Sequence, residues 1–262
     1  MKVLWEAASN AMYGLLSTIH NFVGSWGLAV IVLTLLVRLL LHPLNHKQLV
    51  SMQKMQKLQP RIKMLQEKYK DDKEGLSRET MALYKENKVN PAAGCLPLLV
   101  QLPILILLFR VLMNSDFGGA SFLGITLEGS VLTTMADALG VVAVEGTNIG
   151  FMTVVKAIMA NPAGLASFGL YGPNLLLLGL IIFVTWYQQR MSSTGNPQMA
   201  MMNWFMPIFM GFICLSLPGG VMLYWGASSF IGVGQQWWVL HKTSQEGKPT
   251  LYKDNPMKSK ED

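Results

Sequence analysis

The chain has few charged residues for its length, and its long apolar runs contain no acidic residue. Of its 262 residues, 51% are hydrophobic and 14% are charged, which is too apolar for an ordinary soluble domain. All fifteen acidic residues lie outside the apolar runs. Ion-coupled transporters normally relay protons or sodium through intramembrane carboxylates, so this absence argues against that class and excludes an aspartyl intramembrane protease.

Cysteines are scarce, and the common catalytic and nucleotide motifs are missing. Cys95 and Cys214 both lie in apolar surroundings and indicate neither a disulfide framework nor a metal site. The sequence has no HExxH zinc motif, no GxSxG nucleophile motif and no GxxxxGK[ST] phosphate loop. The N-terminal segment lacks the basic start and cleavage site of a signal peptide. We therefore expect no enzymatic activity, no cofactor and no metal.

What the sequence does contain is five apolar runs, each about as long as a helix that crosses a bilayer. Helices are the economical choice in lipid, because every backbone polar group there needs an internal hydrogen-bond partner. The sequence therefore predicts an all-α integral membrane protein with five transmembrane helices, at residues 22–44, 94–114, 173–189, 200–217 and 219–240.

The net charge of +6 is very unevenly distributed. The loop 115–172 contains a single basic residue, Lys156, whereas the tail 241–262 contains five. By the positive-inside rule the basic segments are cytoplasmic, which places the N-terminus and the loop 115–172 outside and the C-terminus inside. Eleven of the 21 basic residues lie between the first two runs: Lys47, Lys54, Lys57, Arg61, Lys63, Lys68, Lys70, Lys73, Arg78, Lys85 and Lys88.

Helical periodicity outside the runs predicts further elements. Residues 1–21 carry apolar residues at steps of three and four, which predicts an amphipathic helix on the outer interface. Residues 45–91 carry a similar stripe on either side of a polar turn at 71–75, which predicts a cytoplasmic helical hairpin. In the outer loop, the weakly apolar stretches 131–144 and 151–160 are expected to form interfacial helices.

Arg38 is the most informative single residue, because it lies deep in the first run, IVLTLLVRLLLHPL, with no acidic residue nearby. A charge at the centre of a membrane helix costs roughly 2.5–3.5 kcal/mol on insertion scales. Two interpretations remain open. The side chain snorkels to the cytoplasmic interface, or it faces protein or a wet cavity within the membrane.

Several stretches resemble the YidC/Oxa/Alb family of membrane protein insertases in order and spacing. They are NFVGSWG and IVLTLLVRLLLHPL, SMQKMQKLQPRIKMLQEKYKDDKE, MALYKENKVNPAAGCLPLLVQLPI, and NWFMPIFMGF with PGGVMLYW. The resemblance implies a five-helix core with a hydrophilic groove that is open to the cytoplasm and to lipid and closed toward the outside. The family's groove arginine falls on Arg38. Other groove positions fall on Thr34, on Gln188 or Gln189, and on Tyr224 or Trp225, with Gln189 and Trp225 favoured.

The resemblance also implies a function, which is insertion and folding of nascent membrane proteins in the bacterial inner membrane. The implied partners are nascent chains, membrane lipids and a ribosome held by the basic hairpin and tail, with a Sec translocon and the signal recognition pathway as further candidates. Two other classes stay open: a channel or small-solute transporter with Arg38 as its anion site, and a membrane scaffold.

The chain departs from the family pattern in three places. Gram-negative relatives carry an additional leading span and a large periplasmic domain, and Gram-positive relatives usually begin as lipoproteins. Neither feature is present, so we expect a naturally short or a trimmed form. The loop 115–172 matches no family segment, and its role is left open.

Overall fold

The structure, a computed structural model, describes residues 2–90, 96–114, 117–141, 149–192 and 197–245. Almost all of these residues are helical, which confirms the predicted all-α class. One short antiparallel hairpin, β1 (Ser121–Phe122) and β2 (Ile125–Thr126), pairs Ser121 with Thr126. The helices are α1 (Lys2–Val23), α2 (Trp26–Leu40), α3 (His42–Lys57), α4 (Gln59–Lys68), α5 (Lys73–Glu86), α6 (Leu96–Asn114), α7 (Val131–Ala138), α8 (Phe151–Ala160), the 3₁₀ helix η2 (Pro162–Ala166), α9 (Phe168–Ser192), α10 (Pro197–Cys214) and α11 (Gly219–Gln245).

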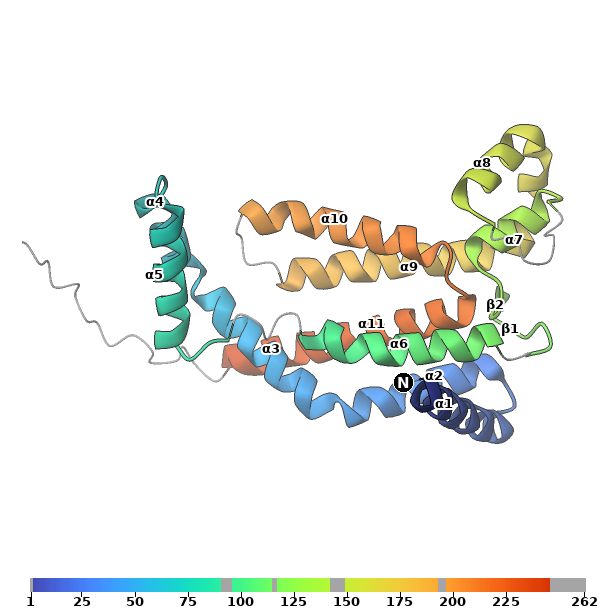
Figure 1. Ribbon diagram of the computed structural model, residues 1–262, viewed down its shortest axis with the longest axis horizontal. Coiled ribbons are helices and arrows are strands. Elements are labelled where there is room, and N and C mark those ends of the chain that lie inside the picture. Colours follow the sequence, from blue (N-terminus) through green and yellow to red (C-terminus); the bar gives the residue numbers. More distant parts are fainter. Residues whose placement is uncertain (1, 91–95, 115–116, 142–148, 193–196, 246–262) are drawn as a thin grey trace, which may run out of the picture.

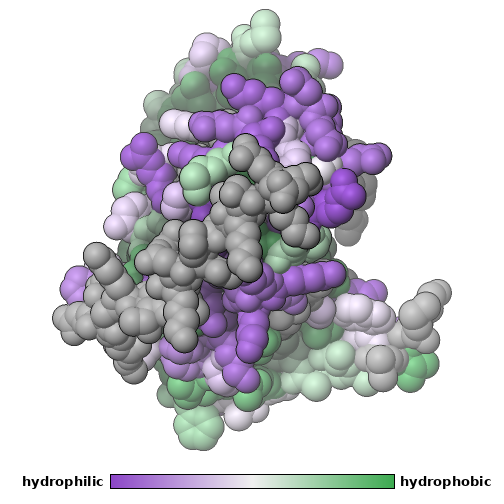
Figure 2. Space-filling view, turned by 90° about the vertical axis from the view of Figure 1, so that its left-hand side faces the viewer, coloured by the Kyte–Doolittle hydropathy of each residue, from purple (hydrophilic) through white to green (hydrophobic). Residues whose placement is uncertain are grey.

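The five predicted spans fall largely on α2, α6, α9, α10 and α11, and these helices run along the long axis of the molecule (Figure 1). The α4–α5 hairpin stands at one end of this bundle, while α7, α8 and the β-hairpin lie at the other. Hydrophilic side chains gather over the hairpin end (Figure 2). The arrangement separates a basic polar end from a predominantly apolar body.

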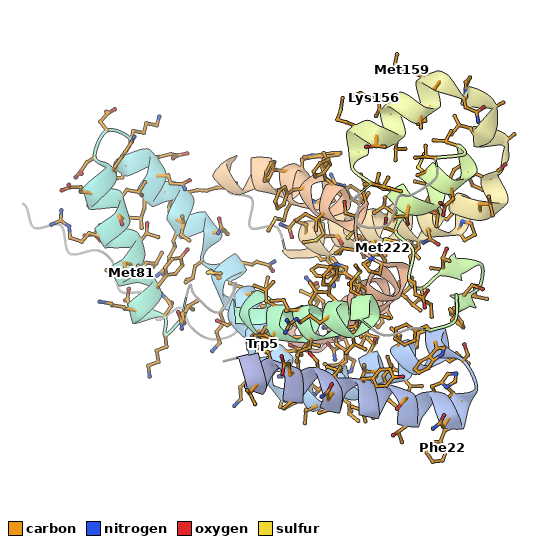
Figure 3. The ribbon with its side chains drawn as sticks, turned by 45° about the vertical axis from the view of Figure 1, so that its right-hand side comes forward. Trp5, Phe22, Met81, Lys156, Met159 and Met222 are labelled. Carbon is orange, nitrogen blue, oxygen red and sulfur yellow. The ribbon has the colours of Figure 1, made fainter. Side chains whose placement is uncertain are left out.

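The core of the bundle is built around α11, which packs against α2, α3, α6 and α9. Its Met222 and Tyr224 are almost completely buried, together with Leu33 of α2 and Ile181 of α9; Met222 lies in the interior in Figure 3. Helices in lipid associate through close packing rather than through the hydrophobic effect. Small residues on α11 therefore allow neighbouring helices to approach it closely, as at the site described below.

The first predicted span differs at both ends from the observed α2. Gly24, at φ +71°, ends α1 and lets the chain turn before α2 begins, a conformation that a residue without a side chain adopts easily. At the other end Pro43 begins α3, because proline fits the first turn of a helix. The predicted range 22–44 therefore spans parts of three helices, and α1 and α2 meet at a bend of 117°.

The N-terminal segment forms a helix, as predicted, and this helix packs on α2 and α6. Leu16 and Ile19 are buried in the core, whereas Leu15 and Phe22 are exposed. Phe22 points away from the protein in Figure 3. The outward apolar side remains available to lipid, and the position of α1 at the outer interface stays a prediction.

The segment 45–91 contains a hairpin of α4 and α5, but its first arm is not one continuous helix. The chain breaks at Leu58 between α3 and α4 because Pro60 lies in the first turn of α4. Asp72 caps α5 by accepting a hydrogen bond from the Gly75 N–H at 2.8 Å. A small separate core then holds the two arms together, formed by Leu58, Ile62, Leu83 and Val89.

The later helices also shift from their predicted limits. α9 begins at Phe168, before the predicted start at 173, since proline is tolerated near the start of a helix. α10 begins at Pro197 and ends at Cys214, whereas the prediction was 200–217. α11 continues to Gln245. Part of the predicted tail, 246–262, and the residues 91–95 before α6 lie outside the described residues.

Length and composition single out α9 within the described ranges, since Phe168–Met191 is by itself long and apolar enough to cross a membrane. Trp5–Val23 and Trp26–Leu40 would make a second crossing if they were counted as one broken span. Gln101–Met113, Phe151–Ala160 and Trp204–Cys214 are apolar but shorter. The number of five spans and their orientation therefore stay predictions.

Candidate functional site

Arg38 lies near the end of α2 and turns toward α11. Its Nε donates a hydrogen bond to Ser228 Oγ at 2.8 Å, and Ser228 is almost completely buried. The guanidinium head is thus held by a neighbouring helix, in agreement with the interpretation that Arg38 faces protein. Among the residues that the structure describes, Arg38 has no carboxylate as an ion-pair partner.

Polar atoms extend from Ser228 along one face of α11. Tyr224 lies one turn earlier, and its hydroxyl contacts Ser228 and accepts a hydrogen bond from Gln101 Nε2 of α6 at 2.8 Å. Residues four positions apart lie on the same helix face. The tyrosine, the serine and Gly232 therefore form a stripe that faces α2, α6 and α9.

Gln188 of α9 completes the site next to Gly232. Its Nε2 donates to the Ser229 carbonyl oxygen at 3.1 Å. A β-carbon at position 232 would lie 2.6 Å from Gln188 Nε2 and 3.5 and 3.6 Å from the two terminal nitrogens of Arg38. Gly232 thus leaves the space in which the amide and the guanidinium come together. We call Arg38, Gln101, Gln188, Tyr224 and Ser228 the arginine cluster.

The other residues expected at the site occupy different surroundings. Thr34 is fully buried, and its hydroxyl donates to the Val30 carbonyl oxygen of its own helix at 2.7 Å. Trp225 packs against the main hydrophobic core, and Gln189 is partly buried on the adjacent face of α9. The structure therefore brings Gln188 and Tyr224 to Arg38, where the resemblance favoured Gln189 and Trp225.

The cluster concentrates positive charge among neutral polar groups. A guanidinium stays charged at physiological pH and carries five N–H donors. Tyrosine, serine and glutamine can solvate that charge without neutralising it, so the site favours an approaching anion. In the described part of the chain, no group of three or more His, Cys, Asp or Glu side chains is placed to hold a metal ion.

At the opposite end of the bundle, the chain between β1 and α7 closes over the helix ends. Asn174 of α9 is fully buried; its Oδ1 accepts from the Thr126 N–H at 3.0 Å, and its Nδ2 donates to the carbonyl oxygens of Thr126 and Gly129 at 3.4 and 3.3 Å. The Gly219 N–H at the start of α11 donates to the Gly129 carbonyl at 2.8 Å. We call the segment 120–130 the outer seal, because the charge distribution predicts that this end of the bundle lies outside.

Three members of the site were not singled out from the sequence: Ser228, Gln101 and Gly232. A usable signal for two of them is the spacing of four that relates Tyr224, Ser228 and Gly232 within an otherwise apolar run. Gln101 offers a weaker signal, as a lone amide in the second run. Their meeting depends on how the helices are rotated and shifted against each other.

Fold and site together define a class: an all-α protein whose apolar helices hold a charged arginine cluster, with the segment 120–130 bonded to the helix ends on one side and a basic hairpin at the other. A model of the 60Kd inner membrane protein family matches residues 18–246. The chain therefore belongs to this family.

Curated relatives and a solved structure agree with this assignment. The membrane protein insertase YidC of Francisella tularensis subsp. novicida is 37% identical over 231 residues, covering 87% of this chain and 35% of the relative. The same protein of subsp. holarctica matches equally well. A crystal structure of an active YidC insertase with its first transmembrane domain resolved superposes with a TM-score of 0.63 at 26% identity, covering 89% of this chain and 46% of the solved one. The chain thus spans about a third of the curated relatives.

Proposed function

We propose that the chain is a membrane protein insertase of the bacterial inner membrane, which inserts nascent membrane proteins and helps them to fold. The observation that carries the proposal is the arginine cluster, a charge held between apolar helices with no carboxylate partner among the described residues. The relatives named insertases support the same activity. The cluster lies near the C-terminal ends of α2 and α9. α2 leads through α3 to the basic hairpin, and this end of the bundle is predicted to be cytoplasmic.

The physical difficulty in insertion is the polar flank of the inserted segment. An apolar segment gains roughly 0.3–0.6 kcal/mol for each leucine-like residue at the membrane centre, whereas each carboxylate costs a few kcal/mol. A hydrophilic groove in the inner leaflet would let an acidic flank travel part of the way while it stays solvated. Arg38 would attract that flank, and the apolar segment would leave sideways into lipid.

The end of the bundle opposite the hairpin matters for keeping the membrane impermeable to ions during insertion. The outer seal joins the start of α11 to α9 through Asn174 and through backbone hydrogen bonds. A groove that is open inward and closed outward would admit a polar flank without a continuous aqueous path. The hydrophobic driving force and the membrane potential then complete the transfer, and no nucleotide hydrolysis is required.

The basic hairpin and tail would receive substrate and hold a ribosome, whose RNA is a polyanion. The segment 45–91, which contains the hairpin, carries eleven of the 21 basic residues, and hydrophilic groups gather at this end of the molecule (Figure 2). A Sec translocon and the signal recognition pathway are further partners in this proposal, as are the surrounding lipids.

The test is insertion of a single-span protein with an acidic N-terminal tail into liposomes that contain only this purified chain. Arg38→Lys keeps the charge and is expected to retain activity, whereas Arg38→Ala is expected to lose most of it. Arg110→Ala, which removes an exposed arginine of α6, is the control and is expected to insert normally. Equal insertion by all variants would contradict a role for the charge of Arg38.

The alternative, a channel or transporter with Arg38 as its anion site, predicts a different result in the same liposomes. Chloride or small organic anions would then cross without any nascent chain, and Arg38→Ala would block that flux. Insertion without anion flux favours the insertase. A scaffold would show neither activity.

A further inference from the structure

An apolar groove of about 390 Å³ lies on the outward side of α9 and α10, away from the arginine cluster. Gly179, Phe183 and Trp186 of α9 line it from one side, and Trp204 and Ile208 of α10 from the other. Figure 1 shows α9 and α10 side by side along one edge of the bundle, and α10 makes its extensive helix contacts with α9. The groove therefore faces whatever surrounds the protein at this edge.

One end of the groove is aromatic and basic. The Trp186 and Trp204 rings lie 6.4 Å apart, and the Arg190 guanidinium carbon lies 5.0 Å from the centre of the Trp186 ring. Arg190 is exposed, so its N–H groups can reach a further partner. Gln56 of α3 donates to the carbonyl oxygen of the next residue, Met191, at 3.1 Å. The basic end of the groove thus lies next to α3, the helix that leads to the lysine-rich hairpin.

The length of the groove matches one leaflet. Arg190 follows Gly179 by eleven positions, which at 1.5 Å per residue is about 16 Å of helix. Half of the hydrocarbon core of a bilayer is about 15 Å. A ligand with its anionic head at Arg190 therefore has its apolar end at Gly179, close to the middle of the membrane.

We propose that the α9–α10 groove binds one anionic phospholipid of the inner leaflet, with its phosphate on Arg190 and an acyl chain between Trp186 and Gly179. This orientation rests on the proposed function, because it places the hairpin in the cytoplasm. Guanidinium groups bind phosphate in a bidentate manner, and basic sites between helices on the cytoplasmic side bind anionic headgroups. Indole rings suit the level of the glycerol backbone.

A substrate helix fits the groove less well than an acyl chain does. A helix is about 10 Å wide, so the length that crosses one leaflet occupies on the order of 1,000 Å³, well above the 390 Å³ of the groove. Gly179 keeps the far end open, since a β-carbon there would meet no atom within 4 Å. The shape is that of an open apolar groove with one charged end.

The experiment measures tryptophan quenching in vesicles that contain either brominated phosphatidylglycerol or brominated phosphatidylcholine at equal mole fraction. We expect the full chain to prefer phosphatidylglycerol about fivefold, which corresponds to about 1 kcal/mol for one basic residue at a membrane surface. Replacing both Trp186 and Trp204 with Phe is expected to remove the selective part of the quenching.

Two matched pairs of variants locate the site. Arg190→Gln is expected to abolish the preference, whereas Arg110→Gln, which removes an exposed arginine near the other end of the bundle, is expected to keep it. Gly179→Phe fills open space and improves helix propensity, and is expected to reduce quenching by both lipids. Leu176→Phe changes an exposed position outside the lining and should have little effect.

Equal quenching by both lipids in the unmodified chain would overturn the proposal, as would a preference that survives Arg190→Gln. Cross-linking of a nascent helix at position 179 without any lipid preference would assign the groove to substrate and would also overturn it. Because quenching needs no nascent chain, a selective chain that fails to insert substrate would refute the proposed function and support the lipid site.

Discussion

Gly232 shows how one missing side chain shapes the arginine cluster. Gln188 of α9 and Arg38 of α2 approach α11 at this position, and a β-carbon there would lie 2.6 Å from the Gln188 amide nitrogen. The amide is the flexible end of a side chain, so it would move away from Ser229 rather than tolerate the contact. The glycine therefore keeps both polar groups in place.

Gly232→Ala is accordingly expected to slow insertion in the liposome assay and to lower thermal stability slightly, because the displaced Gln188 amide loses its hydrogen bond to the Ser229 carbonyl oxygen, which is worth about 1 kcal/mol. Gly234→Ala is the control, since a β-carbon at position 234 would meet no atom within 4 Å. Equal effects of the two substitutions would show that helix propensity, and not the cluster, explains the change.

At the residue scale, the sequence was most informative at a residue whose burial in an apolar helix costs free energy. Arg38 was predictable because a charge in an apolar run needs a physical reason. The choice between Gln188 and Gln189 was not, because neighbours on a helix point about 100° apart and the rotation of α9 is decided by its packing. For the same reason, the sequence could not decide between Tyr224 and Trp225, which are neighbours on α11. The functional roles of all these residues remain proposals.

At the element scale, the outer seal depends on Asn174. Its side chain forms three hydrogen bonds to the backbone of the segment that covers the start of α11. Each buried hydrogen bond contributes about 1 kcal/mol net, and an orphaned group costs more. The seal therefore has one main attachment on α9.

Asn174→Ala is expected to destabilise the protein by about 2–4 kcal/mol and to expose the backbone amides of Thr126 and Gly219 to faster hydrogen exchange. Asn161→Ala, which removes a single hydrogen bond to Leu139 in the outer loop, is expected to cost about 1 kcal/mol without that exposure. Proton or ion leakage through liposomes gives a second measurement. If Asn174→Ala changed neither the amide exchange nor the leakage, the assignment of Asn174 as the main attachment of the outer seal would be contradicted.

The α4–α5 hairpin has a pH dependence of its own. Burial raises the pKa of Tyr84 above its usual value near 10. At pH above that value the unfolded hairpin loses the tyrosine proton while the folded one retains it, so stability falls as pH rises. Hydrogen exchange of the α5 amides should therefore accelerate in alkali, and Tyr84→Phe should reduce the acceleration. Identical pH profiles for both proteins would refute this cause.

Local residues also explain which element boundaries were predictable. The polar turn before α5 and the two outer helices α7 and α8 were expected and are present. The break at Leu58 was missed, although Pro60 marks it in the sequence, because an apolar stripe continued across it. The turn at Gly24 was missed for the same reason, since apolar residues stand on both sides of it.

At the scale of the whole molecule, charge and apolar length predicted a polarised helical bundle, and the structure has this organisation. The basic hairpin lies at one end and the outer seal with α7 and α8 at the other (Figure 1). Lys156 and Met159 lie on the outward side of α8 (Figure 3). The convergence of four helices on Arg38 could not be predicted from periodicity, because it depends on contacts between residues far apart in the chain.

The central claim is that the charge of Arg38 acts on the acidic flank of an inserting segment. The most direct measurement compares insertion rates for two substrates, with Asp or Asn in the flank, into liposomes containing either the unmodified chain or Arg38→Gln. We predict that Arg38→Gln slows the Asp substrate about tenfold, or about 1.4 kcal/mol, and the Asn substrate far less. Equal slowing of both substrates would show that Arg38 supports the fold without acting on the flank, and would contradict the account.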